Sequence, residues 1–162
     1  IMAWQNEMVR IVRNLINDHD TSDPTYSNER LEEVILVSAQ LVQNEIDFDT
    51  VYSIDVDAYT LSPDPTENTR DNNFVNLICL RSALLILGSE YKTSSTNSVR
   101  VTDGPSSIDM TDVTRNSKLL YEQALSDYTK AKVEYKAGNG MAGHAILGPY
   151  TYEGIAGYYS PN

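Results

Sequence analysis

Apolar side chains recur at intervals of three and four residues along much of the chain, which is the pattern of amphipathic helices. This spacing predicts a first helix over residues 3–17 and a second over residues 27–44, with Ser27 as its N-cap. The second helix has a wide apolar surface, so we expect it to be buried on more than one side. A third helix, from residue 69 or 70 to about 92, is apolar nearly all round and is predicted to lie at the centre of the core.

Two other regions alternate between apolar and polar side chains, which is typical of strands with one exposed face. Within residues 51–57 the even-numbered positions are apolar and most odd-numbered ones are polar. Residues 59–61 are expected to pair with this strand. Residues 99–101 and 108–110 lie on either side of an Asp103-Gly104 turn, and together they predict a hairpin.

A fourth helix is predicted over residues 112–137, with Gly138 ending it. The apolar stripe of this helix consists of Leu120, Ala124, Tyr128, Ala131 and Tyr135. The fold class expected from these elements is mainly α: a four-helix domain with short β insertions over residues 1–137, and an extended C-terminal arm over residues 138–162. A chain of 162 residues suits one domain and such an arm.

The C-terminal arm holds six of the eight glycines, four of the eleven tyrosines and one formally charged residue, Glu153. Ordering a glycine-rich segment costs backbone entropy, and tyrosine is enriched at the centres of interfaces. We therefore predict that the arm binds another subunit, the alternative being that it packs onto its own domain. The predicted contact residues are Ile146, Leu147, Tyr150, Tyr152, Ile155, Tyr158 and Tyr159.

The charge of the chain is strongly negative, with a net charge of -11 and a pI near 4.4. Such a balance argues against binding the outside of a nucleic acid, which requires a basic surface. The acids are concentrated in residues 45–71, which contain eight acidic residues and one arginine, for a net charge of -7. Residues 115–136 hold five bases and three acids, for a net charge of +2. This asymmetry would allow one copy to stack beside another.

Candidate catalytic residues are few, and we predict that the chain is not an enzyme. His19 and His144 lie near no recognisable nucleophile motif. Cys79, the one cysteine, lies in the predicted core helix, where a thiol is normally inert, and it excludes an internal disulfide. The sequence of residues 138–143 reads G-x-G-x-x-G, but it follows a helix rather than a strand, so no cofactor is expected.

A metal site and a membrane span were also considered. Asp55, Asp57, Asp64 and Glu67 could supply oxygen ligands to calcium, but their spacing lacks the features of an EF-hand loop, so no metal is predicted. The longest apolar stretch, residues 74–87, is short for a membrane span and contains Arg81. The first helix is too polar for a signal peptide. A small acidic calcium-binding module or a hydrolase remains the alternative from a different functional class.

Four segments of the chain carry a resemblance to a known family: residues 26–49, residues 52–56 (Tyr-Ser-Ile-Asp-Val), residues 62–66 (Ser-Pro-Asp-Pro-Thr) and residues 69–77 (Thr-Arg-Asp-Asn-Asn-Phe-Val-Asn-Leu). They resemble the head-to-tail connector, or neck adaptor, proteins of tailed bacteriophages. The resemblance extends over about residues 8–136, and its motifs are structural. The glycine- and tyrosine-rich arm departs from the family pattern.

The resemblance implies a connector-type domain in a virion protein that is made in the host cytoplasm. It further implies a ring of about twelve copies below the portal protein, followed by the next neck or tail protein. Genome DNA would pass through this ring without specific binding, with Asp55, Asp57 and Asp64 as the residues expected to face the channel. The C-terminal arm would reach the portal. Another neck or tail-completion ring protein is the alternative within the same class.

Overall fold

The computed structural model describes residues 3–20, 22–67, 69–96, 101–103, 106–108 and 111–144, and this part of the chain is mainly helical. The helices are α1 (Ala3–Leu15), α2 (Asn28–Glu45), α3 (Asn72–Thr96) and α4 (Thr111–His144). Two short antiparallel pairs of strands join them: β1 (Ser53–Asp55) with β2 (Thr60–Ser62), and β3 (Val101–Asp103) with β4 (Ser106–Ile108). The predicted fold class is confirmed at this level.

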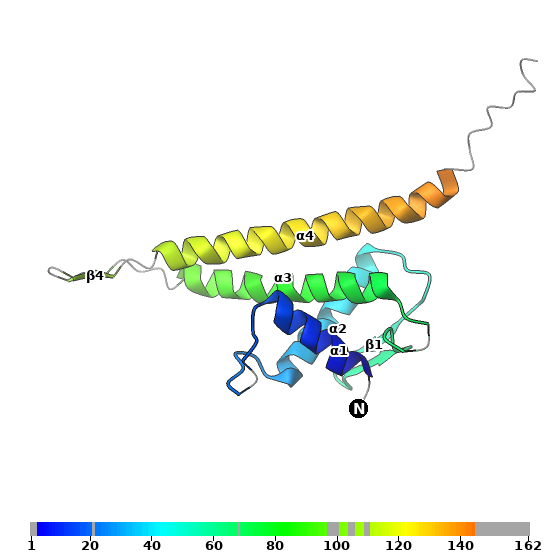
Figure 1. Cartoon of the computed structure of the whole chain (residues 1–162), viewed down its shortest axis with the longest axis horizontal. Coiled ribbons are helices and arrows are strands. Elements are labelled where there is room, and N and C mark those ends of the chain that lie inside the picture. The colour runs from blue at the N-terminus through cyan, green and yellow to red at the C-terminus, as the bar shows by residue number, and fades with distance from the viewer. Residues whose placement is uncertain are drawn as a thin grey trace, which may run out of the picture.

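The helix α3 lies at the centre of the molecule, as its nearly uniform apolar surface predicts. Helices α1 and α2 pack on one side of it and α4 lies along the other (Figure 1). Its length and a mean hydropathy of 1.4 would allow α3 to cross a membrane, but 56% of that stretch is buried inside the molecule. Burial by three other helices is what the core helix of a globular domain requires. Its largest fully buried side chains are Phe74, Leu77 and Ile78.

The loop between α1 and α2 is fixed by Arg13. Its guanidinium pairs with Asp18 and donates hydrogen bonds to the Tyr26 carbonyl oxygen (2.7 Å) and to Asn28 Oδ1 (2.8 Å). Ser27 begins α2, because its hydroxyl accepts a hydrogen bond of 3.2 Å from the Arg30 amide. The predicted N-cap is therefore confirmed.

The β1–β2 hairpin shows the alternation expected from residues 51–57. Ser53 pairs with Ser62 and Asp55 with Thr60, and within residues 51–57 the even-numbered side chains are buried or half-buried while the odd-numbered ones are exposed. The strand is shorter than the alternating segment, because the chain turns at residues 56–59. Tyr52 holds the hairpin against α3: it stacks on Phe74 with ring centroids 3.8 Å apart. Its hydroxyl donates to Asp71 Oδ2 at 3.0 Å.

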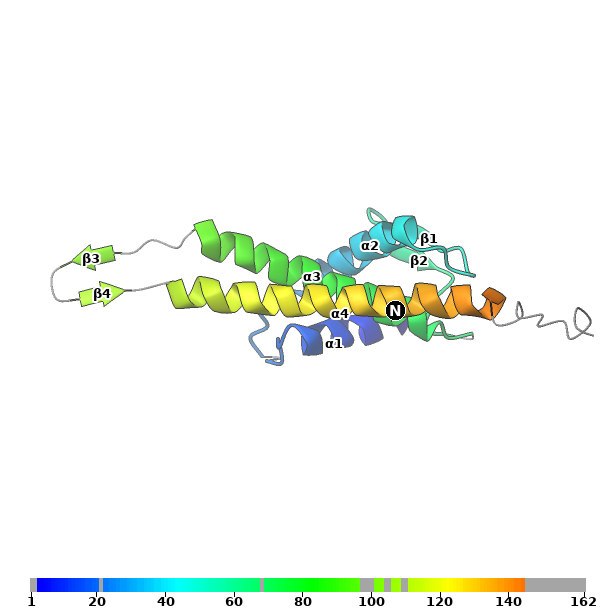
Figure 2. The same ribbon diagram turned by 90° about the horizontal axis from the view of Figure 1, so that it is seen from above.

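The helix α4 departs from the prediction at its C-terminal end. It does not stop at Gly138 but continues to His144, so the predicted extended conformation is wrong for residues 138–144. Glycine costs about 1 kcal/mol in a helix relative to alanine, and it ends a helix only where the chain enters the left-handed region. Figure 2 shows the C-terminal end of α4 extending beyond the ends of the other helices. The rest of the predicted arm, residues 145–162, lies outside the described residues.

The apolar stripe of α4 is also shifted from the predicted one at its first member. Leu120 is 56% exposed, whereas Tyr121 packs on α3 beside Gly88 and stacks on Tyr91 with ring centroids 6.0 Å apart. Counting back from Tyr135 in strictly alternating steps of four and three reaches Tyr121, which continues the buried stripe. The other four predicted members pack on the core.

Candidate interaction surfaces

A cluster of four polar side chains fixes α4 to the rest of the domain, and we call it the polar anchor: Glu45, Arg81, Tyr128 and Lys132. Glu45 ends α2, and its Oε2 accepts hydrogen bonds from Lys132 Nζ (2.6 Å) and the Tyr128 hydroxyl (2.9 Å). Arg81 of α3 lies 3.7 Å from the other carboxylate oxygen and 5.2 Å from the Tyr128 ring centroid. The anchor thus joins three helices at one point.

The polar anchor shifts the ionisation of its own members. The hydrogen bond from Lys132 lowers the pKa of Glu45 below its ordinary value, despite an opposing effect of burial. Burial, and then the neighbouring Glu45 carboxylate, raise the pKa of Tyr128. Both groups therefore keep the charge state that the hydrogen bonds require at neutral pH. The anchor is a structural contact that, with the buried stripe of α4, fixes the orientation of this helix on the domain.

The outward side of α4 carries a shallow hollow of about 660 Å³, which we call the α4 hollow. Its lining residues are Glu122, Leu125, Ser126, Thr129, Lys130, Val133 and Glu134. Leu125 is 40% exposed and Val133 is 59% exposed. No other described element lines this hollow, so its apolar floor is open to a partner.

Charged side chains of both signs lie in and around the α4 hollow, because Glu122 and Glu134 line it together with Lys130. Lys118 and Lys136 are exposed on the same helix, and Lys130 lines the hollow itself. Two of these lysines form loose exposed ion pairs, Lys118 with Glu122 at 3.6 Å and Lys130 with Glu134 at 4.0 Å. Exposed ion pairs of this kind contribute little to the stability of the fold, so breaking them costs little free energy.

The acidic surface predicted from residues 45–71 is formed largely by the segment before β1 and by the β1–β2 hairpin. Asp47, Asp49, Asp55 and Asp57 are all exposed. Val51 lies among them with 80% of its surface exposed. We call residues 47–59 the acidic hairpin. It presents an exposed apolar side chain in a segment of the chain that also carries four exposed aspartates.

Asp64 differs from the other two residues that were expected to face a channel. It is half-buried, and its Oδ2 accepts a hydrogen bond of 3.1 Å from the Trp4 amide in the first turn of α1. Its Oδ1 accepts from the Thr66 amide and hydroxyl at 2.9 and 2.6 Å. A carboxylate at this position caps the start of α1 and favours the helix dipole. Channel exposure of Asp55, Asp57 and Asp64 remains a prediction.

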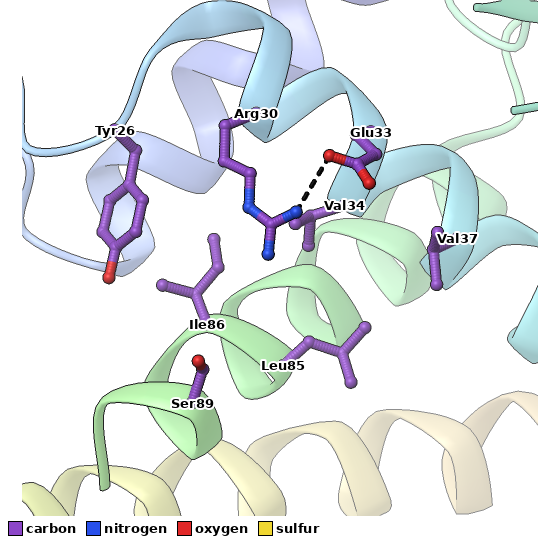
Figure 3. A pocket seen from close by; sticks show the side chains of 8 residues that line it. All are labelled: Tyr26, Arg30, Glu33, Val34, Val37, Leu85, Ile86 and Ser89. Carbon is purple, nitrogen blue, oxygen red and sulfur yellow. Dashed lines mark hydrogen bonds and ion pairs between the residues drawn. The ribbon is translucent and has the colours of Figure 1, made fainter. Parts of the chain in front are cut away.

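A smaller pocket of about 170 Å³ lies between α2 and α3 (Figure 3). Val34, Leu85 and Ile86 provide apolar walls, and Arg30 reaches across one side to pair with Glu33 at 2.8 Å. Near the pocket, the Tyr26 hydroxyl donates to Glu90 Oε1 at 2.6 Å, and burial raises the pKa of this tyrosine. The pocket has room for one apolar side chain, and its lining provides no arrangement of nucleophile and base.

The residues considered for chemistry are not brought together. His19 is exposed in the loop between α1 and α2, and Cys79 is buried in α3, where burial raises the pKa of its thiol to about 12. Among the residues that the structure describes, no group of three or more His, Cys, Asp or Glu side chains could hold a metal ion. The four acids of the calcium alternative therefore do not form a coordination site.

The seven arm residues predicted to contact a partner all lie beyond the described part of the chain. Sequence analysis missed the α4 hollow, although the signal was present: Leu125 and Val133 lie outside the apolar stripe, eight residues apart. Comparison with known protein families, with curated proteins and with solved structures found no match for this chain.

Proposed function

We propose that this chain is a structural virion protein, a head-to-tail connector that forms a ring below the portal and extends the DNA channel towards the tail. The observation that carries the proposal is the pair of uncovered surfaces, the α4 hollow and the acidic hairpin. A chain that leaves apolar side chains exposed on two separate surfaces, Leu125 and Val133 on one and Val51 on the other, is suited to assembly with other chains. In this account the protein acts by assembly and carries out no reaction.

The segments with the family resemblance support the same proposal. Residues 26–49 include all of α2, residues 52–56 include β1, and residues 69–77 contain the start of α3. The first two segments overlap the acidic hairpin, so the resemblance falls in part on the region of the domain that forms this surface. We propose that the domain is of the connector type.

The distribution of acids supports a passage for DNA. The exposed carboxylates of Asp55 and Asp57 lie in a hairpin that is fixed to α3 through Tyr52. Repeated around a ring, such carboxylates repel phosphates, and DNA slides past a wall that does not bind it. This proposal requires that Asp55 and Asp57 face the axis of the ring and are not covered by a neighbouring copy.

The contact with the portal is assigned to the end of the chain. Because α4 continues to His144, the segment available for an arm is residues 145–162, which include all seven predicted contact residues. We propose that the long α4 carries this segment away from the domain and towards the portal. The next neck or tail protein would bind the opposite side of the ring.

The proposal is tested by removing residues 145–162. The shortened chain is expected to keep its circular dichroism spectrum and melting temperature, because the four helices and the polar anchor remain. It is expected to lose binding to a purified portal ring, measured by co-sedimentation beside the full-length chain. Equal binding by both chains would contradict the assignment of the arm.

A further inference from the structure

We infer that residues 145–162 of the free chain fold back along α4 of the same chain and cover an apolar track on this helix. The track has two parts, the α4 hollow and a pocket between α3 and α4. Its occupant is thus the segment of this chain that follows His144. This contact does not depend on the proposed function and is compatible with it, because the segment would leave the track when it binds the portal.

The pocket between α3 and α4, which we call the α3–α4 pocket, has a volume of about 390 Å³. Leu85 and Leu125 contribute aliphatic walls, and the stacked rings of Tyr91 and Tyr121 contribute an aromatic one. The polar lining residues are Arg81, Ser89 and Lys92. None of the described lining residues is acidic. The pocket therefore suits aliphatic or aromatic side chains on a segment whose carbonyl and hydroxyl oxygens can accept hydrogen bonds.

The α3–α4 pocket and the α4 hollow form one continuous surface, because Leu125 lines both of them. Towards the C-terminal end of α4 this surface continues to Val133, which is 59% exposed, and to Glu134. The track thus follows α4 from Tyr121 to Glu134, a length of about 20 Å. Figure 2 shows α4 in front of the other helices, so a segment of chain can approach the track along the outward side of α4.

The arm begins close to this track. Helix α4 ends at His144, about 15 Å beyond Glu134 along the helix axis. An extended chain covers about 3.3 Å per residue, so roughly five residues, 145–149, would bridge that distance. The next large side chains are Tyr150, Tyr152 and Ile155, which would reach the hollow first and then the pocket. The segment that follows α4 is therefore long enough to cover the whole track.

The composition of residues 145–162 suits this surface. Glu153 is their only formally charged residue, so little charge is desolvated when the segment covers apolar side chains. The hollow carries charges of both signs, and Lys130 already pairs with Glu134, so its charges select neither an acidic nor a basic occupant. Selection comes instead from the covalent connection, because a tethered segment has an effective concentration on the order of millimolar. A second copy would compete only at similar concentrations.

Thiol labelling of the full-length chain tests this contact, because the natural Cys79 is buried and its thiol has a raised pKa. Ser126→Cys places a thiol in the α4 hollow, and Ser89→Cys places one in the α3–α4 pocket. Both serines are exposed to solvent as far as the described residues are concerned. The matched control is Ser53→Cys, at an exposed serine of β1 on the other side of α3 (Figure 1).

Each cysteine is placed in the natural sequence and in a full-length chain whose arm carries three substitutions, Tyr150→Ser, Tyr152→Ser and Ile155→Ser. Circular dichroism melting verifies that every variant is folded. With the natural arm, N-ethylmaleimide is expected to react about tenfold more slowly at Ser89→Cys and Ser126→Cys than with the substituted arm. This ratio corresponds to a segment that is docked in about nine of ten molecules. The rate at Ser53→Cys should be the same with both arms.

Equal rates with the two arms at either track position would overturn the inference. Protection that rises with protein concentration would place the arm of a second copy on the track and would also overturn it. The labelling uses no portal, so the two proposals fail separately. Protection without portal binding would contradict only the proposed function, whereas portal binding without protection would contradict only the docking of the arm on α4.

Discussion

Lys132 of α4 donates a hydrogen bond of 2.6 Å to Glu45, the last residue of α2, although the two residues are 87 positions apart in the chain. The same carboxylate oxygen accepts the Tyr128 hydroxyl at 2.9 Å. Together with the buried stripe of α4, this contact fixes the rotation of α4 about its axis. The side of α4 that carries Leu125 and Val133 faces outward because the buried stripe on the opposite side, which includes Tyr128, packs on the core.

The first prediction concerns the polar anchor. Replacing Glu45 with glutamine (Glu45→Gln) removes the charge that Lys132 and Arg81 face, and we expect a loss of about 1 to 3 kcal/mol in the free energy of unfolding at pH 7. Urea unfolding followed by circular dichroism measures it. Glu122→Gln, which breaks only the exposed pair with Lys118, is the control and should change the stability by less than about 0.5 kcal/mol. Equal losses of unfolding free energy in the two variants would show that the polar anchor stabilises the fold no more than an exposed ion pair does.

The second prediction is the pH dependence of that loss. The folded pKa of Glu45 lies below its ordinary value, so its ionised form is the one that stabilises the fold. This contribution is fully present above the unfolded pKa, near 4.5, and is lost as the pH falls through the lower folded pKa. The stability difference between the natural protein and the Glu45→Gln variant should therefore shrink below about pH 4.5. A difference that grew on acidification would have the wrong sign.

The third prediction distinguishes the buried stripe of α4 from the one read off the sequence. Tyr121→Ala removes a ring that packs beside Gly88 and Tyr91, and it is expected to destabilise the fold by about 1 to 3 kcal/mol. Leu120→Ala, at the adjacent exposed position, should cost less than about 0.5 kcal/mol. Thermal unfolding of the two variants measures both values. The reverse order would mean that the sequence-based stripe was right.

The fourth prediction concerns the continuation of α4 through Gly138. A side chain added at Gly138 would meet no atom within 4 Å, and helix propensity favours alanine over glycine by about 1 kcal/mol. Gly138→Ala should therefore raise the melting temperature slightly and increase the helical circular dichroism signal. If the helix instead ended there in a left-handed conformation, the same substitution would destabilise it. The sign of the change in melting temperature decides between the two conformations.

The sequence predicted the parts of the fold that depend on local physics. The 3–4 spacing located α1 and α2, and an almost uniformly apolar segment located α3. Ser27 identified the start of α2 because its hydroxyl can cap only a helix that begins there. The alternation through Tyr52 and Ile54 located the β1–β2 hairpin, because successive side chains of a strand point to opposite faces. In each case the signal and the structure lie within a few residues of each other.

What the sequence could not predict depends on packing between distant segments. From Ala124 a step of four reaches Leu120 and a step of three reaches Tyr121, and the choice between them depends on Gly88 of α3 leaving space for a ring. The end of α4 was predicted too early, because glycine frequently ends helices. A long helix that already packs on α3 can nevertheless continue through a glycine such as Gly138. The polar anchor joins residues that are far apart in sequence, so no pattern reveals it.

The central claim, that this chain is a connector that assembles on a portal, is tested most directly by electron microscopy of the purified full-length chain mixed with a purified portal ring. The account predicts a closed ring of copies stacked on one end of the portal, with an open axial channel continuous through both. Portal rings that remain bare at saturating concentrations of the chain would contradict it.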